Sequence, residues 1–412
     1  MVLEMPTNNN NYNARDSTMI SVAEARRYVQ AYTPEPRVVQ KSILEAVGYV
    51  LACDSIAQEP SPRTTNSAMD GIAYAYSPEC RVLTVVGESA AGKPFKGEVL
   101  HGQAITISTG AVVPESVDTV VPREDYVVNG STVHIIQSVR PGQWIRHRGT
   151  EYSAGSCVLR AGTLIRPAHC ALAAQLGLSH LAVWDAPRVA LLASGQELVD
   201  ASERCDLSDA QVYDTNTPML QAAVRESGGN VCMVQRIPDE LYASEQALQK
   251  AIECADIICT TGGVSVGEHD YIRRAAERLG FETVFWRVRQ KPGKPFFFAR
   301  RNRVLLFGLP GNPVSAYICF RYYVQPVIAA MRRYSSVWKT AKAVMGSSLV
   351  NRHGRAEFVR VRLTQESSGL VAEALNKQDS YMLTSLTEAD GIVFLDADTA
   401  MDEGMQIEVM LF

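Results

Sequence analysis

The sequence predicts a multidomain α/β plus β protein built around a central, mostly parallel α/β domain. The chain has 412 residues, more than one hydrophobic core usually holds. One stretch alternates short apolar runs with helical patterns, as in a parallel sheet covered on both faces. Two others contain short β-like runs between glycine and proline turns. The expected parts are a disordered tail (1–17), a helical linker domain (18–55 and 153–186), an inserted small β domain (56–152), the α/β domain (187–337) and a C-terminal β domain (338–412).

The linker domain is expected to contain helices on both sides of the insertion. Ser21 followed by Glu24 has the spacing of a capping box, in which each residue satisfies a backbone N–H of the other. Apolar residues at spacings of three and four predict a second helix over 38–55 and a return to helix over 159–184. We expect these segments to meet in space.

The α/β domain has clear strand and helix signals. Helical segments separate the branched apolar runs "RVALLAS", "NVCMVQRI", "DIICT" and "RVLLFG", and a long final helix starts at Pro313. Residues 281–300 break the alternation and are expected to form a β-hairpin.

Composition narrows the class of protein. A net charge of −4 argues against a large nucleic-acid interface, which needs surplus Lys and Arg. No apolar run reaches the roughly 18 residues of a membrane-spanning helix, and the polar start is not a signal peptide, so we expect a cytoplasmic protein that contacts no membrane. Nine scattered cysteines without a CxxC pair indicate reduced, buried thiols, and the seven histidines show no zinc-ligand spacing.

Three loops that follow predicted parallel strands have unusual sequences. They cover residues 195–197, 261–270 and 309–315. Ligands of open α/β sheets bind outside the carboxyl ends of the strands, so these loops are expected to converge on one rim. Glycines such as Gly262 and Gly263 let the backbone approach an anion, although a single glycine pair is more often only a turn. Three such loops together favour a binding site.

Charged residues near this rim suggest its chemistry. Glu197 and Asp270 are carboxylates that suit Mg²⁺, while Asp270 equally suits a helix cap. Lys291 and Lys294, in the turn "KPGKP", would neutralise an oxyanion there; a solvated hairpin tip is the alternative. In the β domain Asp70, with Thr109 and Gly110, lies in turn-like motifs of low specificity when taken alone.

The motifs together resemble those of molybdopterin molybdenumtransferases, the MoeA family that includes the gephyrin E-domain. They are "NSAMDGIA", "STGAVVP", "IRHRGTEYSAG", "GQELV", "VYDTN", "TGGVSVGEHDY", "KPGKPFFFA" and "LPGNPVSA", in this order, and the resemblance covers nearly the whole chain beyond residue 17. It implies Mg²⁺-dependent insertion of molybdate into adenylylated molybdopterin with release of AMP, the last step of molybdenum cofactor biosynthesis. It also implies a homodimer of four-domain subunits, with the active site between the molybdopterin-binding α/β domain of one subunit and the inserted β domain of the other.

Site residues follow from the resemblance position by position. Glu197 and Asp270 are the expected metal ligands, and with Asp70 they are the expected catalytic residues. The expected substrate-binding residues are Thr109, Gly110, Glu151, Asp239, Gly262, Gly263, Ser265, Lys291, Lys294, Pro310, Asn312, Pro313, Ser315 and Ser380.

The sequence departs from the family pattern at several positions. Glu151 stands where the family usually has Asp, and Ile72 replaces a common aromatic residue. The "VVPRED" stretch replaces a more usual Met-Gln-Glu, and Asp379-Ser380-Tyr381 stands where many members read Gly-Ser-His. The core motifs are intact, whereas the substrate-facing details differ.

Three alternative functions remain at the sequence level. They are a molybdopterin adenylyltransferase-like activity, a tungstate-inserting paralogue and a non-catalytic, pterin-binding scaffold. The expected partners are a second copy of the chain, the molybdopterin-adenylylating enzyme and molybdoenzyme maturation factors.

Overall fold

The computed structural model describes most of the chain after its N-terminal segment. The predicted disordered tail lies outside the described residues, as do Ser265 and Asp270. The described ranges are 19–203, 206–263, 271–334, 338–367 and 369–412.

These residues form two compact units. The first combines residues up to 41 with 46–50 and 182–412, and the second combines 42–45 with 51–181. The first unit contains the α/β domain and the C-terminal β domain, and the second contains the inserted β domain. No helix in the described part of the chain has the length and apolar character needed to cross a bilayer.

A six-stranded sheet forms the centre of the first unit. Its strand order is β17-β14-β18-β22-β21-β19. The first four strands run parallel, whereas β21 and β19 are antiparallel, as the predicted hairpin requires. The strands are β14 (Arg188–Ser194), β17 (Asn230–Ile237), β18 (Ile257–Thr261), β19 (Glu282–Trp286), β21 (Phe297–Arg301) and β22 (Val304–Leu309).

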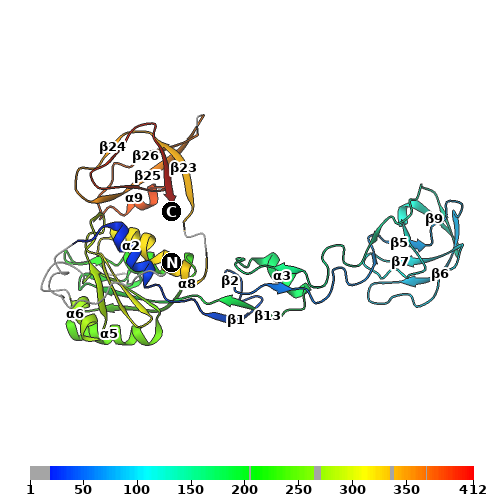
Figure 1. Ribbon diagram of the computed structural model, residues 1–412, viewed down its shortest axis with the longest axis horizontal. Coiled ribbons are helices and arrows are strands. Elements are labelled where there is room, and N and C mark those ends of the chain that lie inside the picture. The colour runs from blue at the N-terminus through cyan, green and yellow to red at the C-terminus, as the bar shows by residue number, and fades with distance from the viewer. Residues whose placement is uncertain (1–18, 204–205, 264–270, 335–337, 368) are drawn as a thin grey trace, which may run out of the picture. The chain divides into compact units, whose positions relative to one another are not determined.

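Helices cover both faces of this sheet because alternate side chains of its strands point to opposite sides. Val189 and Leu191 of β14 belong to a core shared with α2, α4, α7 and α8. Ala190 and Leu192 belong to a core shared with α5 and α6, which lie side by side (Figure 1). The helices are α2 (Val22–Ala31), α4 (Asn216–Glu226), α5 (Leu241–Cys254), α6 (Tyr271–Arg278), α7 (Pro313–Cys319) and α8 (Gln325–Met331).

The long helix predicted from Pro313 is interrupted by a π-helical turn. This turn, η3 (Phe320–Val324), joins α7 to α8. Pro326 stands in the first turn of α8 and lacks the N–H that would donate back to the preceding turn. Widened turns of this kind are rare and often occur at functional sites.

Helix α2 begins at the predicted capping box. The Ser21 hydroxyl accepts a hydrogen bond from the Glu24 N–H at 3.2 Å, and the Glu24 carboxylate accepts one from the Ser21 N–H at 2.8 Å. Hydrogen bonds from the side chain and backbone of Ser21 lower the pKa of Glu24. The capping prediction is confirmed.

The helix predicted over 38–55 is wrong. This segment forms β1 (Val38–Ser42), a series of turns and β2 (Val50–Leu51). Gly48, with φ of +85°, is in a left-handed conformation that ends any helical path. The segment pairs with β13 (His180–Trp184) in the order β1-β13-β2. Strand pairing therefore overrides a helical spacing, which is only a weak local preference.

The return to helix over 159–184 is only partly correct, because α3 (Pro167–Gln175) is its helical part and β13 is a strand. The two segments that flank the insertion do meet, but as strands.

The second unit has at its centre a six-stranded sheet of order β8-β5-β7-β6-β10-β9. Ile72 and Tyr74 of β5 pack on one face and Ala73 on the other. The strands predicted in this region are confirmed (Figure 1). Its elements are β3 (Ser55–Ile56), β4 (Asn66–Ser67), β5 (Gly71–Tyr74), β6 (Val82–Ser89), β7 (Gln103–Ile107), β8 (Thr119–Pro122), η1 (Arg123–Asp125), β9 (Tyr126–Asn129), β10 (Thr132–Ile135), β11 (Ile145–Arg146) and β12 (Cys157–Leu159).

The C-terminal β domain is a small barrel. Its strands follow the order β25-β26-β23-β29-β27, and β27 pairs back to β25, which closes the ring. A short strand of the α/β domain, β20 (Gln290–Lys291), adds in parallel to β25. The remaining elements are β23 (Thr340–Met345), β24 (Leu349–Val350), β25 (Ala356–Glu366), β26 (Gly369–Ala374), α9 (Thr384–Glu388), β27 (Gly391–Leu395), β28 (Ala400–Met401) and β29 (Gln406–Leu411).

The described cysteines are all free thiols, as predicted, but the expectation that they are buried is only partly met. Cys170, Cys259 and Cys319 are buried, whereas Cys53, Cys157 and Cys232 are exposed. Cys53 lies in a bend and Cys157 in a short strand, and Cys232 lies in β17, whose side chains alternate between exposed and partly buried.

Candidate functional site

A cavity of about 870 Å³ lies at the carboxyl edge of the α/β sheet. Strands β14, β18 and β22 are parallel neighbours, so the loops that follow them leave from the same edge. All three loops reach the cavity, which confirms the predicted convergence for the described residues. Its lining residues are Glu197, Leu198, Val212, Tyr213, Asp214, Thr215, Asn216, Gly262, Gly263, Gln290, Lys291, Pro292, Gly293, Lys294, Pro295, Pro310, Gly311, Asn312, Pro313, Ser315, Arg355, Gln378, Asp379, Ser380, Tyr381 and Leu383.

The glycine pair after β18 is required by the backbone. Gly262 and Gly263 have φ of +76° and +66°, a region that side chains other than glycine rarely adopt. A Cβ on Gly262 would lie 2.3 Å from the carbonyl oxygen of Ser194, at the end of β14. The pair therefore lets the β18 loop approach the β14 loop at the cavity wall. Ser265 and Asp270, further along this loop, lie outside the described residues, so their predicted roles stay predictions.

Glu197 lines the cavity with an acidic side chain. It directly precedes β15 (Leu198–Val199), and its backbone carbonyl accepts a hydrogen bond from Val212 at 2.8 Å, where β16 (Val212–Tyr213) begins. Among the residues that the structure describes, none donates a hydrogen bond to the Glu197 carboxylate. A carboxylate without a partner at a cavity wall suits a hard cation such as Mg²⁺. Its predicted second ligand, Asp270, is not described.

Two polar residues of the "VYDTN" stretch support the site, although no role was predicted for them individually. The Asp214 carboxylate accepts a hydrogen bond from the Thr217 N–H at 3.0 Å and so caps α4. The Asn216 amide donates to the Gly311 carbonyl at 2.7 Å and fixes the β22 loop. The Asn216 carbonyl oxygen is buried and has no partner within the described ranges. It is therefore an acceptor free for a ligand donor.

Three cations face the cavity, and their pairing differs. Lys291 forms an ion pair with Glu357 of β25 at 3.2 Å. Lys294 and Arg355 have no carboxylate partner among the described residues. Cations without partners favour an anionic ligand. The turn "KPGKP" thus lies at the predicted rim rather than at a solvated hairpin tip.

The loop after β22 connects the cavity to the C-terminal β domain. The Asn312 amide donates to the Ser380 hydroxyl at 2.8 Å, and the Val314 N–H donates to the Ser380 carbonyl at 3.2 Å. The C-terminal β domain therefore brings Ser380 to the cavity lining, and its predicted contact with substrate stays a prediction. Pro310, Pro313 and Ser315 line the same wall.

Asp239 does not line the cavity. It follows β17, and its carboxylate accepts a short hydrogen bond from the Ser194 hydroxyl, at the end of β14. The structure thus places Asp239 behind the wall formed by the β14 loop. Its predicted contact with substrate stays a prediction.

The remaining predicted residues belong to the inserted β domain and form local interactions there. The Asp70 carboxylate accepts a hydrogen bond from the Thr109 N–H at 2.8 Å, and the next residue, Gly110, has φ of +80°. The exposed Glu151 carboxylate accepts hydrogen bonds from Ser61 at 2.6 Å and Gln175 at 2.9 Å. These bonds, that of Ser61 first, lower the pKa of Glu151. Asp70 and Thr109 are therefore in direct contact, and their predicted roles stay predictions.

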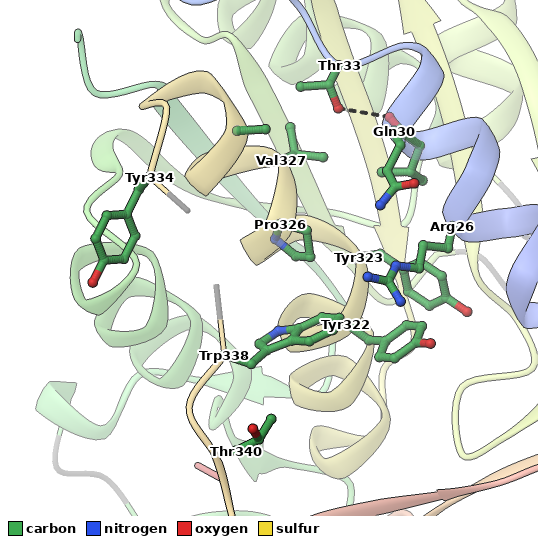
Figure 2. A pocket seen from close by; sticks show the side chains of 12 residues that line it. Arg26, Gln30, Thr33, Tyr322, Tyr323, Pro326, Val327, Tyr334, Trp338 and Thr340 are labelled. Carbon is green, nitrogen blue, oxygen red and sulfur yellow. Dashed lines mark hydrogen bonds between the residues drawn. The ribbon is translucent and has the colours of Figure 1, made fainter. Parts of the chain in front are cut away.

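A second cavity, of about 650 Å³, has a different character. It lies between α2, η3 and α8, and Figure 2 shows Arg26 near the rings of Tyr322 and Trp338. The Arg26 guanidinium is 5.0 Å from the Trp338 ring centre and 5.7 Å from that of Tyr322. Within the described part of the chain, Arg26 is the charged residue of this lining, and its guanidinium lies over aromatic rings.

Sequence reasoning missed several residues that line the main cavity. Arg355, Gln378 and Tyr381 come from the C-terminal β domain, and Gln290 precedes the lysine turn. Arg355, Gln378 and Gln290 stand in no local pattern that marks a site. A signal was available for Tyr381, which follows Ser380 at a family motif position, and for Asp214 and Asn216, through the "VYDTN" motif.

Sequence comparison matches the whole architecture to one family. The MoeA N-terminal region (domain I and II) matches residues 20–177. A probable molybdopterin binding domain matches 190–330, and the MoeA C-terminal region (domain IV) matches 342–412. The main cavity lies at the sheet edge of the second region and is closed by residues of the third.

Individual relatives support the same family assignment. The molybdopterin molybdenumtransferase of Haemophilus influenzae is 31% identical over 388 residues, covering 92% of this chain and 95% of its own. Molybdopterin molybdenumtransferase 2 of Mycobacterium tuberculosis is 31% identical over 408 residues, covering 95% of this chain and 99% of its own. A crystal structure of the molybdopterin biosynthesis MoeA protein from Pyrococcus horikoshii superimposes with a TM-score of 0.74 and 26% identity, covering 96% of this chain and all of that one. With three family regions matched in order and this identity over nearly its full length, the chain belongs to the molybdopterin molybdenumtransferase (MoeA) family.

Proposed function

We propose that this protein inserts molybdate into adenylylated molybdopterin and releases AMP, the last step of molybdenum cofactor biosynthesis, in the cytoplasm. One observation carries the proposal. The lining of the cavity at the edge of the molybdopterin-binding domain contains Lys294, Arg355 and Glu197, and none of the three has an ion-pair partner among the residues that the structure describes. Cations and a free carboxylate in one cavity suit a reaction whose substrates are anions and whose cofactor is a divalent cation.

The proposed roles follow from charge and position. Lys294 and Arg355 attract molybdate and stabilise the negative charge that builds up as the phosphoanhydride breaks. Lys291 shares its charge with Glu357, so it contributes less to anion binding than Lys294. The buried Asn216 carbonyl oxygen accepts a hydrogen bond from an N–H group of the pterin, and the glycine loop receives the pterin phosphate.

Mg²⁺ fits the described residues through Glu197. Magnesium keeps several waters and is commonly bound by one or two carboxylates together with substrate phosphates. Glu197 supplies one such carboxylate at the cavity wall. Asp270 is proposed as the second. The bound ion would neutralise the charge of the phosphoanhydride.

The inserted β domain is proposed to complete the site across a homodimer. Asp70, Thr109, Gly110 and Glu151 belong to the second compact unit, whereas the cavity belongs to the first. In a dimer whose partner supplies these residues, Asp70 acts on the substrate together with Glu197, and the longer Glu151 reaches one methylene further than an aspartate. The adenylylating enzyme and molybdoenzyme maturation factors are proposed as partners.

Of the alternative functions, the adenylyltransferase-like activity and the pure scaffold lose support. The choice between molybdate and tungstate is decided by experiment. An adenylyltransferase-like activity would use the molybdopterin-binding region alone, but both MoeA regions that flank it are present. A pure scaffold would not need the carboxylate of Glu197 and the cations Lys294 and Arg355 in one cavity lining. Molybdate and tungstate have the same shape and charge, so the choice between them needs measurement.

Lys294→Ala tests the role of the cavity charge. Loss of a charge-assisted contact of about 1.5–3 kcal/mol raises the KM for molybdate in AMP release by about 10- to 100-fold. Lys342→Ala is the matched control, because Lys342 is an exposed lysine of β23 outside the cavity. An unchanged KM in the Lys294 variant contradicts the proposed oxyanion site. The same assay with tungstate in place of molybdate identifies the preferred oxyanion.

A further inference from the structure

A buried polar network lies beneath the lysine turn. Gln290 is completely buried, and its amide donates to the Gly293 carbonyl at 3.2 Å and to the Cys319 sulfur at 3.3 Å. The Gln290 carbonyl oxygen accepts a hydrogen bond from the Tyr323 hydroxyl. All hydrogen-bonding groups of the Gln290 side chain therefore point at the turn or at the helix behind it. Buried polar networks that are fully satisfied fix one conformation.

The π-helical turn supplies the far side of this network. Cys319 ends α7, and Tyr323 lies in η3, where the helix is widened. The Tyr323 ring stacks on Phe296 with a centroid separation of 4.6 Å. Phe296 follows the lysine turn and donates its N–H to the Lys294 carbonyl at 3.0 Å. Tyr323 thus contacts the residues on both sides of the turn, through Gln290 before it and Phe296 after it.

The turn fits tightly onto this network. Gly293 has φ of +92°, and a Cβ there would lie 2.5 Å from the Cys319 sulfur and 2.7 Å from the Gln290 amide nitrogen. On its other side the turn is held by the barrel, because Gln290 and Lys291 pair with Ala356 and Glu357 of β25. The two lysines therefore project from a backbone that is fixed on both sides.

We propose that Gln290 and Tyr323 are positioning residues that set the placement of Lys291 and Lys294 for the oxyanion substrate. This inference rests on the proposed function, because the oxyanion is the ligand of that function. Neither residue supplies charge. Each acts through the backbone of the turn, and the affinity of a cavity for an anion depends on ångström-scale placement of its cations.

A positioning role and a merely structural role predict different behaviour in a double variant. Tyr323→Phe leaves the buried Gln290 oxygen without a donor, which lowers stability. Gln290→Met with Tyr323→Phe replaces both partners by apolar groups, so most of this loss should be recovered. Tyr323→Phe alone keeps the hydrogen bond from Gln290 to the Gly293 carbonyl. In the double variant that carbonyl loses the Gln290 amide and keeps only the Cys319 thiol, at 4.0 Å, so the turn is released.

The experiment compares Tyr323→Phe, the double variant and the wild-type protein. Tyr322→Phe is the control, because Tyr322 is the neighbouring tyrosine of η3 and its ring stacks on that of Trp338 (Figure 2). The measurements are the unfolding midpoint in urea, kcat and KM for molybdate in AMP release, and amide hydrogen exchange of residues 288–297.

The positioning role predicts that the double variant regains part of the midpoint lost in Tyr323→Phe, while its KM stays raised by about 5- to 20-fold, corresponding to about 1–2 kcal/mol. Exchange over 288–297 is also faster than in the Tyr322 control. A KM that returns to the wild-type value together with the midpoint overturns the proposal. If the wild-type protein releases no AMP, the proposed function fails, and hydrogen exchange still decides whether the network holds the turn: unchanged exchange overturns that claim.

Discussion

Replacing Gly262 by alanine tests whether the cavity wall depends on a close backbone approach. Alanine at φ of +76° costs about 1–2 kcal/mol, because a Cβ is unfavourable in the left-handed region. The new Cβ would also lie 2.3 Å from the Ser194 carbonyl oxygen, and forcing this contact apart adds about 1–3 kcal/mol. The expected loss of stability is therefore about 2–5 kcal/mol.

Gly280→Ala is the matched control for this prediction. Gly280 follows α6 at φ of +80°, but the nearest atom to its Cβ would be 4.0 Å away. It therefore carries only the conformational cost of about 1–2 kcal/mol. Urea unfolding of both variants, followed by far-UV circular dichroism, gives the two losses. If the Gly262 variant is no less stable than the Gly280 variant, the β18 loop does not pack against the end of β14, and the account of the cavity wall is refuted.

Three further predictions concern charge and thiols. Glu197→Gln should change the free energy of unfolding by less than about 0.5 kcal/mol, since the carboxylate has no partner among the described residues. The rate of AMP release should fall by at least about 100-fold, and a near-normal rate would exclude Glu197 from the reaction. Burial favours a higher pKa for Asp256, but hydrogen bonds from Arg188 and the charge of Arg37 outweigh burial and lower the pKa. The ionised Asp256 therefore stabilises the folded protein above the unfolded-state pKa of about 3.9, and this stabilisation disappears as pH falls through the folded-state pKa. Asp256→Asn should therefore destabilise the protein at pH 7, with a difference from wild type that shrinks on acidification; a pH-independent difference in urea midpoints would contradict this. The thiols of Cys232 and Cys254 are 3.6 Å apart, so the oxidant diamide should join them in a disulfide. If the two cysteines are alkylated as free thiols after diamide treatment, as seen in a non-reduced peptide digest, the observed geometry is contradicted.

The α/β domain could be predicted well because its local signals agree with its fold. Continuous apolar runs such as "RVALLAS" have the composition of strands buried on both faces, and β14 is such a strand. The rim position of Glu197, Gly262 and Pro310 followed from strand order alone, since parallel neighbours end at one edge.

The linker and the far wall of the cavity could not be predicted in the same way. Residues 38–55 have helical apolar spacing, yet their strand conformation depends on pairing with β13, about 130 residues later in the chain. Arg355 and Gln378 reach the cavity because the barrel packs beside the sheet, which no local pattern encodes. The role of Gln290 likewise depends on a π-helical turn that hydrophobic spacing does not reveal.

AMP release from adenylylated molybdopterin by the purified protein with Mg²⁺, measured with and without molybdate, tests the central claim most directly. We expect release that requires molybdate, because Lys294 and Arg355 of the cavity must hold the oxyanion before the phosphoanhydride is cleaved. Tight pterin binding without AMP release under either condition would contradict the claim and identify the chain as a pterin-binding scaffold.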